Sequence, residues 1–365
     1  MEILEAATHS NTADAPVDLK TMGRADLEAF AAEMDQPSYR GQQLFNWIYG
    51  KDTTDFAAMS SLPKSFRRDL ADVATVSRIE ERQTQQSSDG TIKGLYDLPS
   101  GRTIEAVLIP KVDERGDAQR LTVCVSSQVG CAMGCRFCAT GLMGFQENVS
   151  AGAIYDQVAY MNEHALAHFG RPVTNIVYMG MGEPLLNYDN VLKSVGIITD
   201  DHSLGLSPQR ITVSTVGLAR RIRDLADDRV RFNLAVSLHA PTNEQRSAIM
   251  PINESEKTSL SALKEAIQYY ADTTGRQITY EYCLFKDMND SVEDAKNLAE
   301  ITTWAPSKVN IIMYNPVEGL NFERTPEDQL NRFIQALVEE GVTVTVRRSR
   351  GDDIDAACGQ LAVDE

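Results

Sequence analysis

The stretch that decides the fold is LTVCVSSQVGCAMGCRFC, residues 121–138. It opens as a β-branched apolar run typical of a buried strand. It ends in three cysteines, Cys131, Cys135 and Cys138, spaced four and then three residues apart. We therefore predict a strand followed by a loop that presents three thiols at the strand's carboxyl end, which is the end where barrel enzymes carry their chemistry.

Short apolar runs alternate with amphipathic helical patterns from here to about residue 350. After LTVCVSS, the predicted strands are TNIVYMG, RITVST, RFNLAVSL, QITYEYCL, KVNIIMY and VTVTVR. Repeated strand–helix units predict a parallel sheet with right-handed crossovers. Six or so units are too many for a small motif and too few for a closed eight-stranded barrel. The expected fold class is α/β, with a partial (β/α)6 barrel over residues 121–350.

The remaining segments predict further parts of the chain. Residues 1–18 are small, polar and aperiodic, so we expect a disordered leader. Apolar residues at helical spacing predict a small helical accessory domain over residues 19–85. The segments GLYDL and RTIEAVLIP predict connecting strands within residues 86–120, and residues 351–365 form a C-terminal tail.

Charge and composition limit the classes of function. The formal net charge of −17 over 365 residues argues against broad, nonspecific attraction to nucleic acid, but it allows a local basic patch. Two candidate patches are PKSFRRDL (Lys64, Arg67, Arg68) and VRRSRG (Arg347, Arg348, Arg350), although either cluster alone more often marks a solvated surface.

The chain is expected to be cytoplasmic. No apolar run approaches the roughly 20 residues of a membrane span, and the first residues lack the pattern of a secretory signal. Because the cytosol is reducing, the six cysteines are better explained as metal ligands, catalytic thiols or core residues than as a disulfide framework.

Three thiols on one loop leave two interpretations. A structural zinc site needs four closed ligands, and Cys124 could supply the fourth. A four-iron cluster held by three thiolates instead keeps one iron open for a substrate or cofactor. The second interpretation is favoured, since Cys124 lies mid-strand and structural zinc sites more often pair two C-x2-4-C motifs.

Polar residues follow the other predicted strands. They are Gly182 and Glu183 in GMGEP, Ser214 in ITVST, Ser237, Leu238 and His239 in AVSLHAP, and Asn315 in MYNP. Each alone has an ordinary explanation, such as a helix cap, a loop histidine or an Asn-Pro turn. A parallel barrel, however, would bring all of them to one rim, so together they predict one site.

The cysteine motif, with Phe137 just before the last thiol, resembles the signature of the radical S-adenosylmethionine (SAM) superfamily. The resemblance implies a 4Fe-4S cluster on Cys131, Cys135 and Cys138 whose open iron binds SAM. It also implies SAM contacts at the strand-end residues named above, with the Gly-Glu-Pro motif receiving the amino group of the methionine moiety.

Longer motifs narrow the resemblance. YRGQQLFNWIYG, LTVCVSSQVGCAMGCRFCATG, YMGMGEPLLN, AVSLHAP, MYNP and RRSRGDDIDAACGQL are similar to the RlmN family of RNA methyltransferases. This implies methylation of carbon 2 of adenine 2503 in 23S rRNA and of adenine 37 in tRNA, with two SAM per turnover. The rivals are a related enzyme that methylates carbon 8 of the same ribosomal adenine and, from another class, an RNA-binding protein with a structural four-cysteine zinc site.

The resemblance also implies roles for residues outside the cluster motif. Cys358 would take a methyl group to become S-methylcysteine, Cys124 would form a transient disulfide with it, and Glu105 would accept a proton. Cys283 gains no role and is assigned to the core.

If the substrate is RNA, the accessory domain is expected to bind it. Arg40, Lys64, Arg67 and Arg68 could hold the RNA backbone while the target base is unstacked. The other expected partner is an electron donor such as flavodoxin or ferredoxin. The protein is expected to act as a monomer without a membrane.

Overall fold

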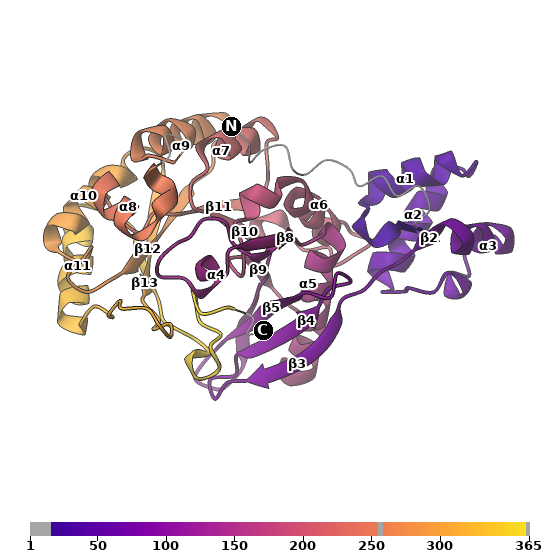
Figure 1. Ribbon diagram of the computed structural model, residues 1–365, viewed down its shortest axis with the longest axis horizontal. Coiled ribbons are helices and arrows are strands. Elements are labelled where there is room, and N and C mark those ends of the chain that lie inside the picture. The colour runs from indigo at the N-terminus through magenta and orange to yellow at the C-terminus, as the bar shows by residue number, and fades with distance from the viewer. Residues whose placement is uncertain (1–15, 255–257, 363–365) are drawn as a thin grey trace. The chain divides into compact units, whose positions relative to one another are not determined.

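The computed structural model describes residues 16–254 and 258–362. The chain forms two compact units, Met1–Arg78 and Ile79–Glu365 (Figure 1). The first contains most of the predicted accessory domain. The second contains the predicted barrel together with the strands expected to connect to it.

The N-terminal unit is built from short helical segments. These are η1 (Leu19–Thr21), α1 (Arg24–Glu33), α2 (Tyr39–Phe45), the π-turn η2 (Asn46–Gly50), η3 (Phe56–Ala58) and α3 (Lys64–Val73). Its core is apolar, with Leu27, Leu44 and Phe66 all buried. α1 and α2 approach so closely that a Cβ at Gly41 would lie 2.3 Å from the Cα of Glu28, so only glycine fits there.

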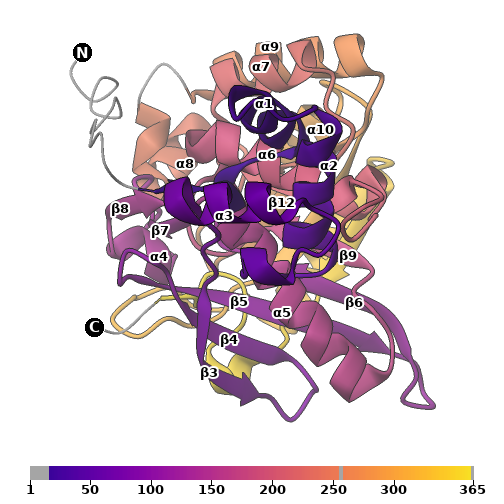
Figure 2. The same ribbon diagram turned by 90° about the vertical axis from the view of Figure 1, so that its right-hand side faces the viewer.

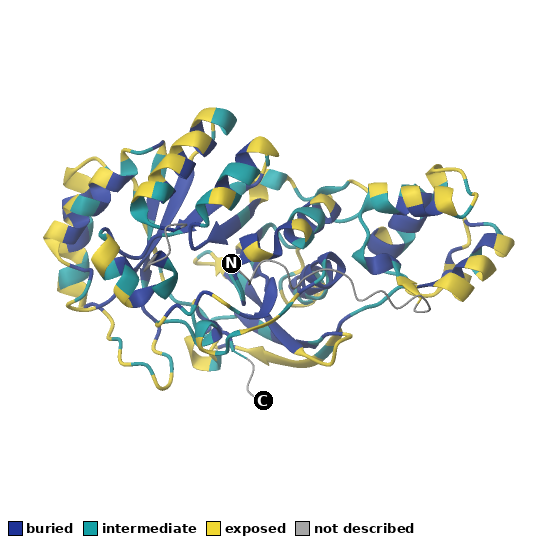
Figure 3. Cartoon of the chain, turned by 45° about the horizontal axis from the view of Figure 1, so that its top comes forward, coloured by how far each residue is buried: buried dark blue, intermediate teal, exposed yellow. Residues whose placement is uncertain are grey.

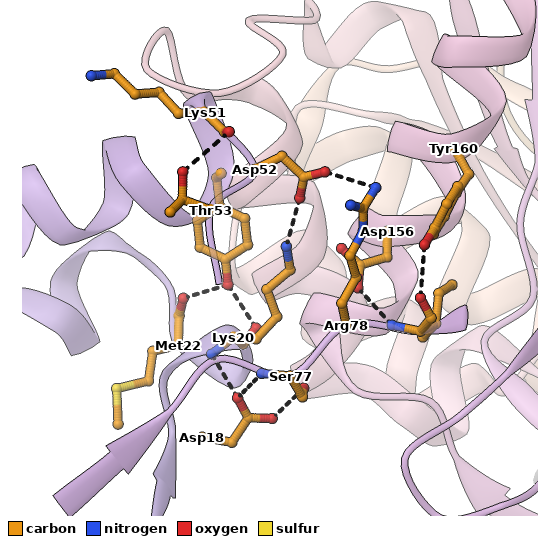
Figure 4. A network of polar contacts seen from close by, with 12 residues as sticks. Asp18, Lys20, Met22, Lys51, Asp52, Thr53, Ser77, Arg78, Asp156 and Tyr160 are labelled. Carbon is orange, nitrogen blue, oxygen red and sulfur yellow. Dashed lines mark hydrogen bonds and ion pairs between the residues drawn. The ribbon is translucent and has the colours of Figure 1, made fainter. Parts of the chain in front are cut away.

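A short parallel pair joins the two ends of this unit. β1 (Val17–Asp18) pairs with β2 (Ala74–Thr75). Beyond the pair, the Asp18 carboxylate accepts hydrogen bonds from the Ser77 backbone N–H at 3.0 Å and from the Ser77 hydroxyl at 2.5 Å (Figure 4). These contacts fix the chain where it leaves the unit.

Asp52 lies between two cations of the same unit (Figure 4). Its carboxylate is 3.5 Å from the Nζ of Lys20 and 2.8 Å from Nη2 of Arg78. The Lys20 side chain is only 2% exposed. Because a buried ammonium is costly without a counter-charge, Asp52 is a structural requirement of this unit.

Two predicted boundaries differ from the structure. Residues 1–15 of the expected disordered leader lie outside the described residues, but Val17–Asp18 forms β1 and is ordered. The accessory domain was expected to reach residue 85, whereas β3 (Glu80–Gln86) belongs to the sheet of the second unit. The sequence pattern does not predict β3, because this edge strand is mostly exposed and lacks alternating apolar residues.

One ten-stranded sheet organises the second unit. Its order is β14-β13-β12-β11-β10-β9-β6-β5-β4-β3. Besides β3, its strands are β4 (Ile92–Asp97), β5 (Thr103–Val112), β6 (Ala118–Cys124), β9 (Asn175–Tyr178), β10 (Ile211–Thr215), β11 (Asn233–Ser237), β12 (Ile278–Leu284), β13 (Ser307–Met313) and β14 (Val344–Arg347). Strands β3 to β6 are antiparallel, and β6 with β9 to β14 are parallel. All seven predicted barrel strands are confirmed, and the connecting strands extend the same sheet.

Helices join the parallel strands. They are α5 (Ala151–Phe169), α6 (Tyr188–Thr199), α7 (Ala219–Asp227), α8 (Asn243–Ile249), α9 (Leu260–Thr274), α10 (Val292–Thr302) and α11 (Glu327–Glu339). The six crossovers from β6 to β14 confirm the predicted α/β class and the partial (β/α)6 barrel. Among the described residues, no helix is long and apolar enough to cross a membrane.

Burial follows the layers of this unit (Figure 3). The parallel strands are largely buried, and the helices are buried on one side and exposed on the other. α5 packs against β4, β5 and β6 (Figure 2). It begins at the cap Ser150, whose Oγ accepts from the Ala153 N–H. It also holds Ile79, because the Asp156 carboxylate accepts from the Ile79 N–H at 3.2 Å and the Tyr160 hydroxyl donates to the Ile79 carbonyl at 3.0 Å (Figure 4).

The predicted C-terminal tail is ordered over residues 351–362, with η7 (Asp352–Ile354) near its start. Its hydrogen-bond partners come from distant segments. The Gly359 carbonyl accepts from the Ala139 N–H at 2.8 Å, and the Leu361 carbonyl accepts from the Thr140 hydroxyl at 2.5 Å. The tail is therefore held beside α4 (Ala139–Leu142), the short helix that follows the three-cysteine loop.

Asp52→Ala tests the network of the N-terminal unit. We expect it to destabilise this unit by about 2 kcal/mol, because Lys20 and Arg78 lose their shared counter-charge. Amide hydrogen exchange of residues 17–78 in the full chain measures the effect. Asp69→Ala, an exposed acid on α3, is the matched control. Equal protection in both variants would contradict the structural role of Asp52.

Candidate active site

One pocket lies at the carboxyl ends of the parallel strands. Most of the predicted site residues line it, namely Cys124, Cys131, Cys135, Cys138, Gly182, Glu183, Ser214, Ser237, His239 and Cys358. Three predicted residues, Leu238, Asn315 and Glu105, lie outside its lining. Parallel pairing thus gathers segments from across the second unit.

The three-cysteine loop is fixed by its backbone. The Cys131 N–H donates to the Gly144 carbonyl at 3.0 Å, and the Cys138 N–H donates to the Cys135 carbonyl at 3.3 Å. Gly130 precedes the loop with φ of +69°, and a Cβ there would collide with the Gly144 carbonyl. The loop has almost no regular secondary structure, so these contacts and apolar packing determine its shape.

Burial disfavours the thiolate form of Cys131 and Cys135. It raises the pKa of Cys131 to about 12, and it raises that of Cys135 well above its usual value. The neighbouring thiols raise the pKa of Cys135 further. Because only thiolates bind metals, a bound metal must supply the charge that stabilises them.

The donor set fits an iron–sulfur cluster. Three thiols from one loop reach one pocket, and thiolates are the usual ligands of such clusters. Within residues 16–254 and 258–362, no three His, Cys, Asp or Glu side chains converge on a single metal ion. This does not bear on a cluster, in which each thiolate binds a different iron atom.

Glu183 links the loops that follow β9 and β10. Its carboxylate accepts hydrogen bonds from the Val216 N–H at 2.8 Å and the Leu185 N–H at 3.0 Å. Burial raises its pKa to about 7, although these hydrogen bonds oppose the shift. The adjacent Gly182 has φ of +97°, and a Cβ there would lie 2.4 Å from the Cβ of Gln128. The backbone can take this path only with glycine.

The ends of β10 and β11 place two hydroxyls and an imidazole together. The Oγ atoms of Ser214 and Ser237 are 3.3 Å apart. His239 adopts a left-handed conformation with φ of +58°, and its Nδ1 accepts from the Cys283 N–H at 3.0 Å. Burial, assisted by the nearby Arg246, lowers the pKa of His239 to about 3. The imidazole is therefore neutral, with its proton on Nε2. The adjoining Leu238 is fully buried.

Cys124 and Cys358 come from segments far apart in the chain, the first parallel strand and the tail that follows the last one. Cys124 ends β6, whereas Cys358 is exposed and lies on the tail. Burial raises the pKa of Cys124 to about 12, the Cys358 thiol raises it further, and Arg347 opposes the shift. Although Cys358 as a residue is exposed, desolvation by the surrounding protein atoms raises the pKa of its thiol, and Arg347 opposes this shift. One guanidinium therefore favours the thiolate form of both cysteines.

Sequence reasoning missed the role of Arg347, which it assigned to a surface cluster. Its Nη1 is 3.6 Å from Oε2 of Glu281, and both residues line the pocket. Oε1 of Glu281 accepts from the Asn310 side-chain N–H at 2.9 Å. The sequence did contain a signal for this role. Arg347 ends the predicted strand VTVTVR, and most of the other predicted site residues also lie at the ends of predicted strands.

Arg246 was missed for a different reason. Its guanidinium is completely buried and donates to the carbonyls of Leu238, Val216 and Thr258 and to the Asn253 side chain. It thereby fixes the loops that follow β10 and β11. Its place inside the short helix α8 offers no sequence signal, since its carbonyl partners belong to distant segments.

Two of the predicted residues outside the lining, Asn315 and Glu105, hold the tail. The Asn315 side-chain N–H donates to the Cys358 carbonyl at 3.1 Å. The buried Glu105 accepts from the Ala362 N–H at 3.1 Å and lies 3.1 Å from the Nζ of Lys93. Cys283, assigned to the core, is buried in the apolar cluster under the pocket and also reaches its lining.

Comparisons with known proteins identify the family. Residues 17–76 match the N-terminal domain of ribosomal RNA large subunit methyltransferases, and residues 125–299 match the radical SAM superfamily. The probable dual-specificity RNA methyltransferase RlmN of Salinibacter ruber is 70% identical over 99% of this chain and 98% of its own length. The chain belongs to the RlmN family of dual-specificity RNA methyltransferases.

Other members and a solved structure agree. The dual-specificity RNA methyltransferase RlmN of Halorhodospira halophila is 42% identical over 97% of this chain and 95% of its own length. The crystal structure of a radical SAM methyltransferase from Sphaerobacter thermophilus is 41% identical, with a TM-score of 0.85, over 95% of this chain and 99% of that one. RlmN family membership favours an iron–sulfur cluster and SAM over the structural zinc alternative.

Glu183→Gln tests the buried carboxyl. Since the folded-state pKa of about 7 exceeds the ordinary value of 4.5, ionisation of Glu183 opposes folding. The contribution of Glu183 to the free energy of unfolding should be fully present below pH 4.5. It should fall by about 3 kcal/mol as the pH rises from 4.5 through 7. Glutamine cannot ionise, so Glu183→Gln should not lose this contribution. Between pH 4.5 and 7 the free energy of unfolding of the variant should therefore rise relative to that of the wild type. Urea unfolding of the cluster-free protein at several pH values measures it, and a constant difference would contradict the shift.

Arg347→Met tests the charge near the two thiols. Without the guanidinium the pKa of Cys358 should rise further, so its alkylation by iodoacetamide at neutral pH should slow several-fold. Mass spectrometry of the peptide that contains Cys358 measures the rate. Arg348→Met, at the exposed next position, is the matched control. Equal alkylation in both variants would exclude an electrostatic effect of Arg347.

Proposed function

We propose that this RlmN-family enzyme methylates carbon 2 of adenine, at adenine 2503 of 23S rRNA and adenine 37 of tRNA. The observation that carries the proposal is the meeting of Cys124, Cys358 and the three-cysteine loop in one pocket. Carbon 2 of adenine is electron-poor and offers no nucleophile to a sulfonium methyl group. The methyl group therefore reaches the base by way of an enzyme thiol and a radical.

Cys358 is the proposed methyl acceptor. Its thiolate attacks the methyl carbon of one SAM, a carbon–sulfur bond forms, and S-adenosylhomocysteine leaves with the electron pair of the broken bond. The thiol proton is lost before the attack. Arg347 favours this ionisation, since it opposes the rise in the pKa of Cys358. Asn315 fixes the backbone of the nucleophile through the Cys358 carbonyl.

SAM and the cluster have proposed ligands in the same pocket. Cys131, Cys135 and Cys138 would hold a 4Fe-4S cluster, which would supply an open iron and the electron needed to cleave a second SAM to a 5′-deoxyadenosyl radical. Gly182, Glu183, Ser214, Ser237, His239 and Asn315 are the proposed SAM contacts. Leu238 supports this set from the core and, being fully buried, is proposed to contribute only its backbone.

Cys124 is the proposed resolving thiol. The S-methyl group of Cys358 would give one hydrogen atom to the 5′-deoxyadenosyl radical, and the carbon radical left on the sulfur would add to carbon 2 of the base. The adduct would then return its unpaired electron to the cluster, and Glu105 would accept the proton that leaves carbon 2, which leaves a thioether between Cys358 and the RNA. The Cys124 thiolate then attacks the Cys358 sulfur, a disulfide forms, and the electron pair of the broken carbon–sulfur bond stays with the RNA product, which is protonated. A cellular thiol reductant restores both cysteines.

The remaining partners are proposed from the sequence. Flavodoxin or ferredoxin would supply the electron, and the enzyme would act as a monomer. Arg40, Lys64, Arg67 and Arg68 of the N-terminal unit are proposed to contact the RNA backbone.

Cysteine variants test the proposed chemistry. Reconstituted Cys358→Ala should keep its iron and sulfide but transfer no methyl group from labelled SAM to an RNA fragment. Cys124→Ala should accumulate a covalent protein–RNA adduct, because the thioether is not resolved. Cys283→Ala, which removes another buried thiol of the same pocket, should still methylate.

The product identifies the position. Nucleoside digestion and mass spectrometry should give 2-methyladenosine, whereas 8-methyladenosine would identify the rival carbon 8 enzyme. Methylation by Cys358→Ala would exclude this residue as the carrier.

A further inference from the structure

Positive charge is concentrated in one part of the N-terminal unit. Residues 36–68 contain five lysines and arginines, Arg40, Lys51, Lys64, Arg67 and Arg68, against two aspartates, Asp52 and Asp55. The whole chain carries a net charge of −17. This segment therefore has a local excess of three positive charges on an acidic protein, although Asp35 and Asp69 flank it, and these cations are available to a polyanion.

Two aromatic side chains lie among these cations. The guanidinium carbon of Arg40 is 4.8 Å from the ring centroid of Tyr39, and the Nζ of Lys51 is 3.5 Å from that of Trp47. Ser61 joins the pairs, because its carbonyl accepts from Nη1 of Arg40 at 3.2 Å and its hydroxyl accepts from Nε1 of Trp47 at 2.8 Å. Tyr39, Arg40, Trp47 and Lys51 thus form one continuous surface, the aromatic–cationic surface.

Tyr39 and Trp47 are not among the buried core residues of the unit. Phe45 and Tyr49, from the same stretch of chain, are 0% and 2% exposed and pack with their ring centroids 4.8 Å apart. Tyr39 is 51% exposed, and Trp47 is only partly buried. One set of aromatic residues therefore builds the core while the other set faces solvent beside cations.

We propose that the aromatic–cationic surface binds unpaired nucleotides of the RNA substrate, whose bases stack on Tyr39 and Trp47. Aromatic rings accept any base by stacking, and adjacent cations neutralise the phosphates. Lys64, Arg67 and Arg68 lie on α3, which begins three residues after Ser61, and they add cations to the same segment of the chain. Single-stranded loops are the RNA elements whose bases are free to stack. The inference rests on the proposed RNA methylation and assigns part of its substrate binding to the N-terminal unit.

Binding of an RNA hairpin with an unpaired loop, measured by fluorescence anisotropy with the full-length enzyme, tests the proposal. Tyr39→Ala should weaken binding about ten-fold without changing the dependence of affinity on salt, because no charge is lost. Arg40→Ala should weaken binding and reduce the salt slope by about one. A blunt duplex of the same length has no unpaired bases to stack on Tyr39. Tyr39→Ala should therefore not weaken the binding of this duplex.

Tyr269→Ala is the matched control. Tyr269 is a surface tyrosine, 37% exposed, whose ring centroid lies 5.0 Å from the guanidinium carbon of Arg223 in the second unit. This variant should bind the hairpin and methylate it like the wild type. Equal binding by Tyr39→Ala and Tyr269→Ala would overturn the inference. An equal loss for hairpin and duplex in Tyr39→Ala would also overturn it.

Fluorescence gives a second readout that does not depend on affinity. The chain has two tryptophans, so Trp304→Phe leaves Trp47 as the single reporter. Stacking predicts that the hairpin quenches its emission, while Trp47→Phe, which retains Trp304, shows no quenching. Methylation by the wild type is measured on the same hairpin. A wild type that methylates without quenching of Trp47 would overturn only this inference, whereas a wild type that binds but never methylates would overturn the proposed function.

Discussion

Parallel pairing of seven strands is the constraint on which the active site depends. Because β6 and β9 to β14 run in one direction, the segments that follow them open at one edge of the sheet. The three-cysteine loop, Glu183, His239 and Arg347 meet there although they are far apart in the chain. A reversed strand would send its residues to the opposite edge, so the chemistry depends on topology before it depends on any single side chain.

The pocket holds polar groups that are costly to bury, and each has a structural partner. Glu183 accepts two backbone N–H groups, Arg246 donates to three carbonyls and an amide, and His239 accepts from Cys283. These contacts connect successive strand-end loops, which have little regular secondary structure of their own. These groups, which line the pocket or lie beside it, therefore fix its walls, as expected where pre-organisation supports catalysis.

Over residues 351–362, the tail that carries Cys358 has no regular strand and no long helix. Its hydrogen bonds to Ala139, Thr140, Asn315 and Glu105 connect it to three separate parts of the second unit. They hold Cys358 at the pocket that Cys124 enters from β6. Two thiols whose ionisation is disfavoured by burial share one guanidinium, that of Arg347, which is the only cation lining this pocket among the described residues.

The sequence by itself determined the strand–helix alternation, the number of barrel units, the cysteine loop and the polar residues after each strand, because apolar periodicity and strand ends are local signals. The long motifs further indicated the family. The sequence did not predict the edge strand β3, because this strand is mostly exposed and has no alternating apolar residues. Only the tertiary structure decided which strand-end residues face the pocket, that Leu238 is buried beside them, that Asn315 and Glu105 hold the tail, and that Arg246 and Arg347 belong to the site. These facts depend on contacts between segments distant in the chain, and local residue patterns do not encode such contacts.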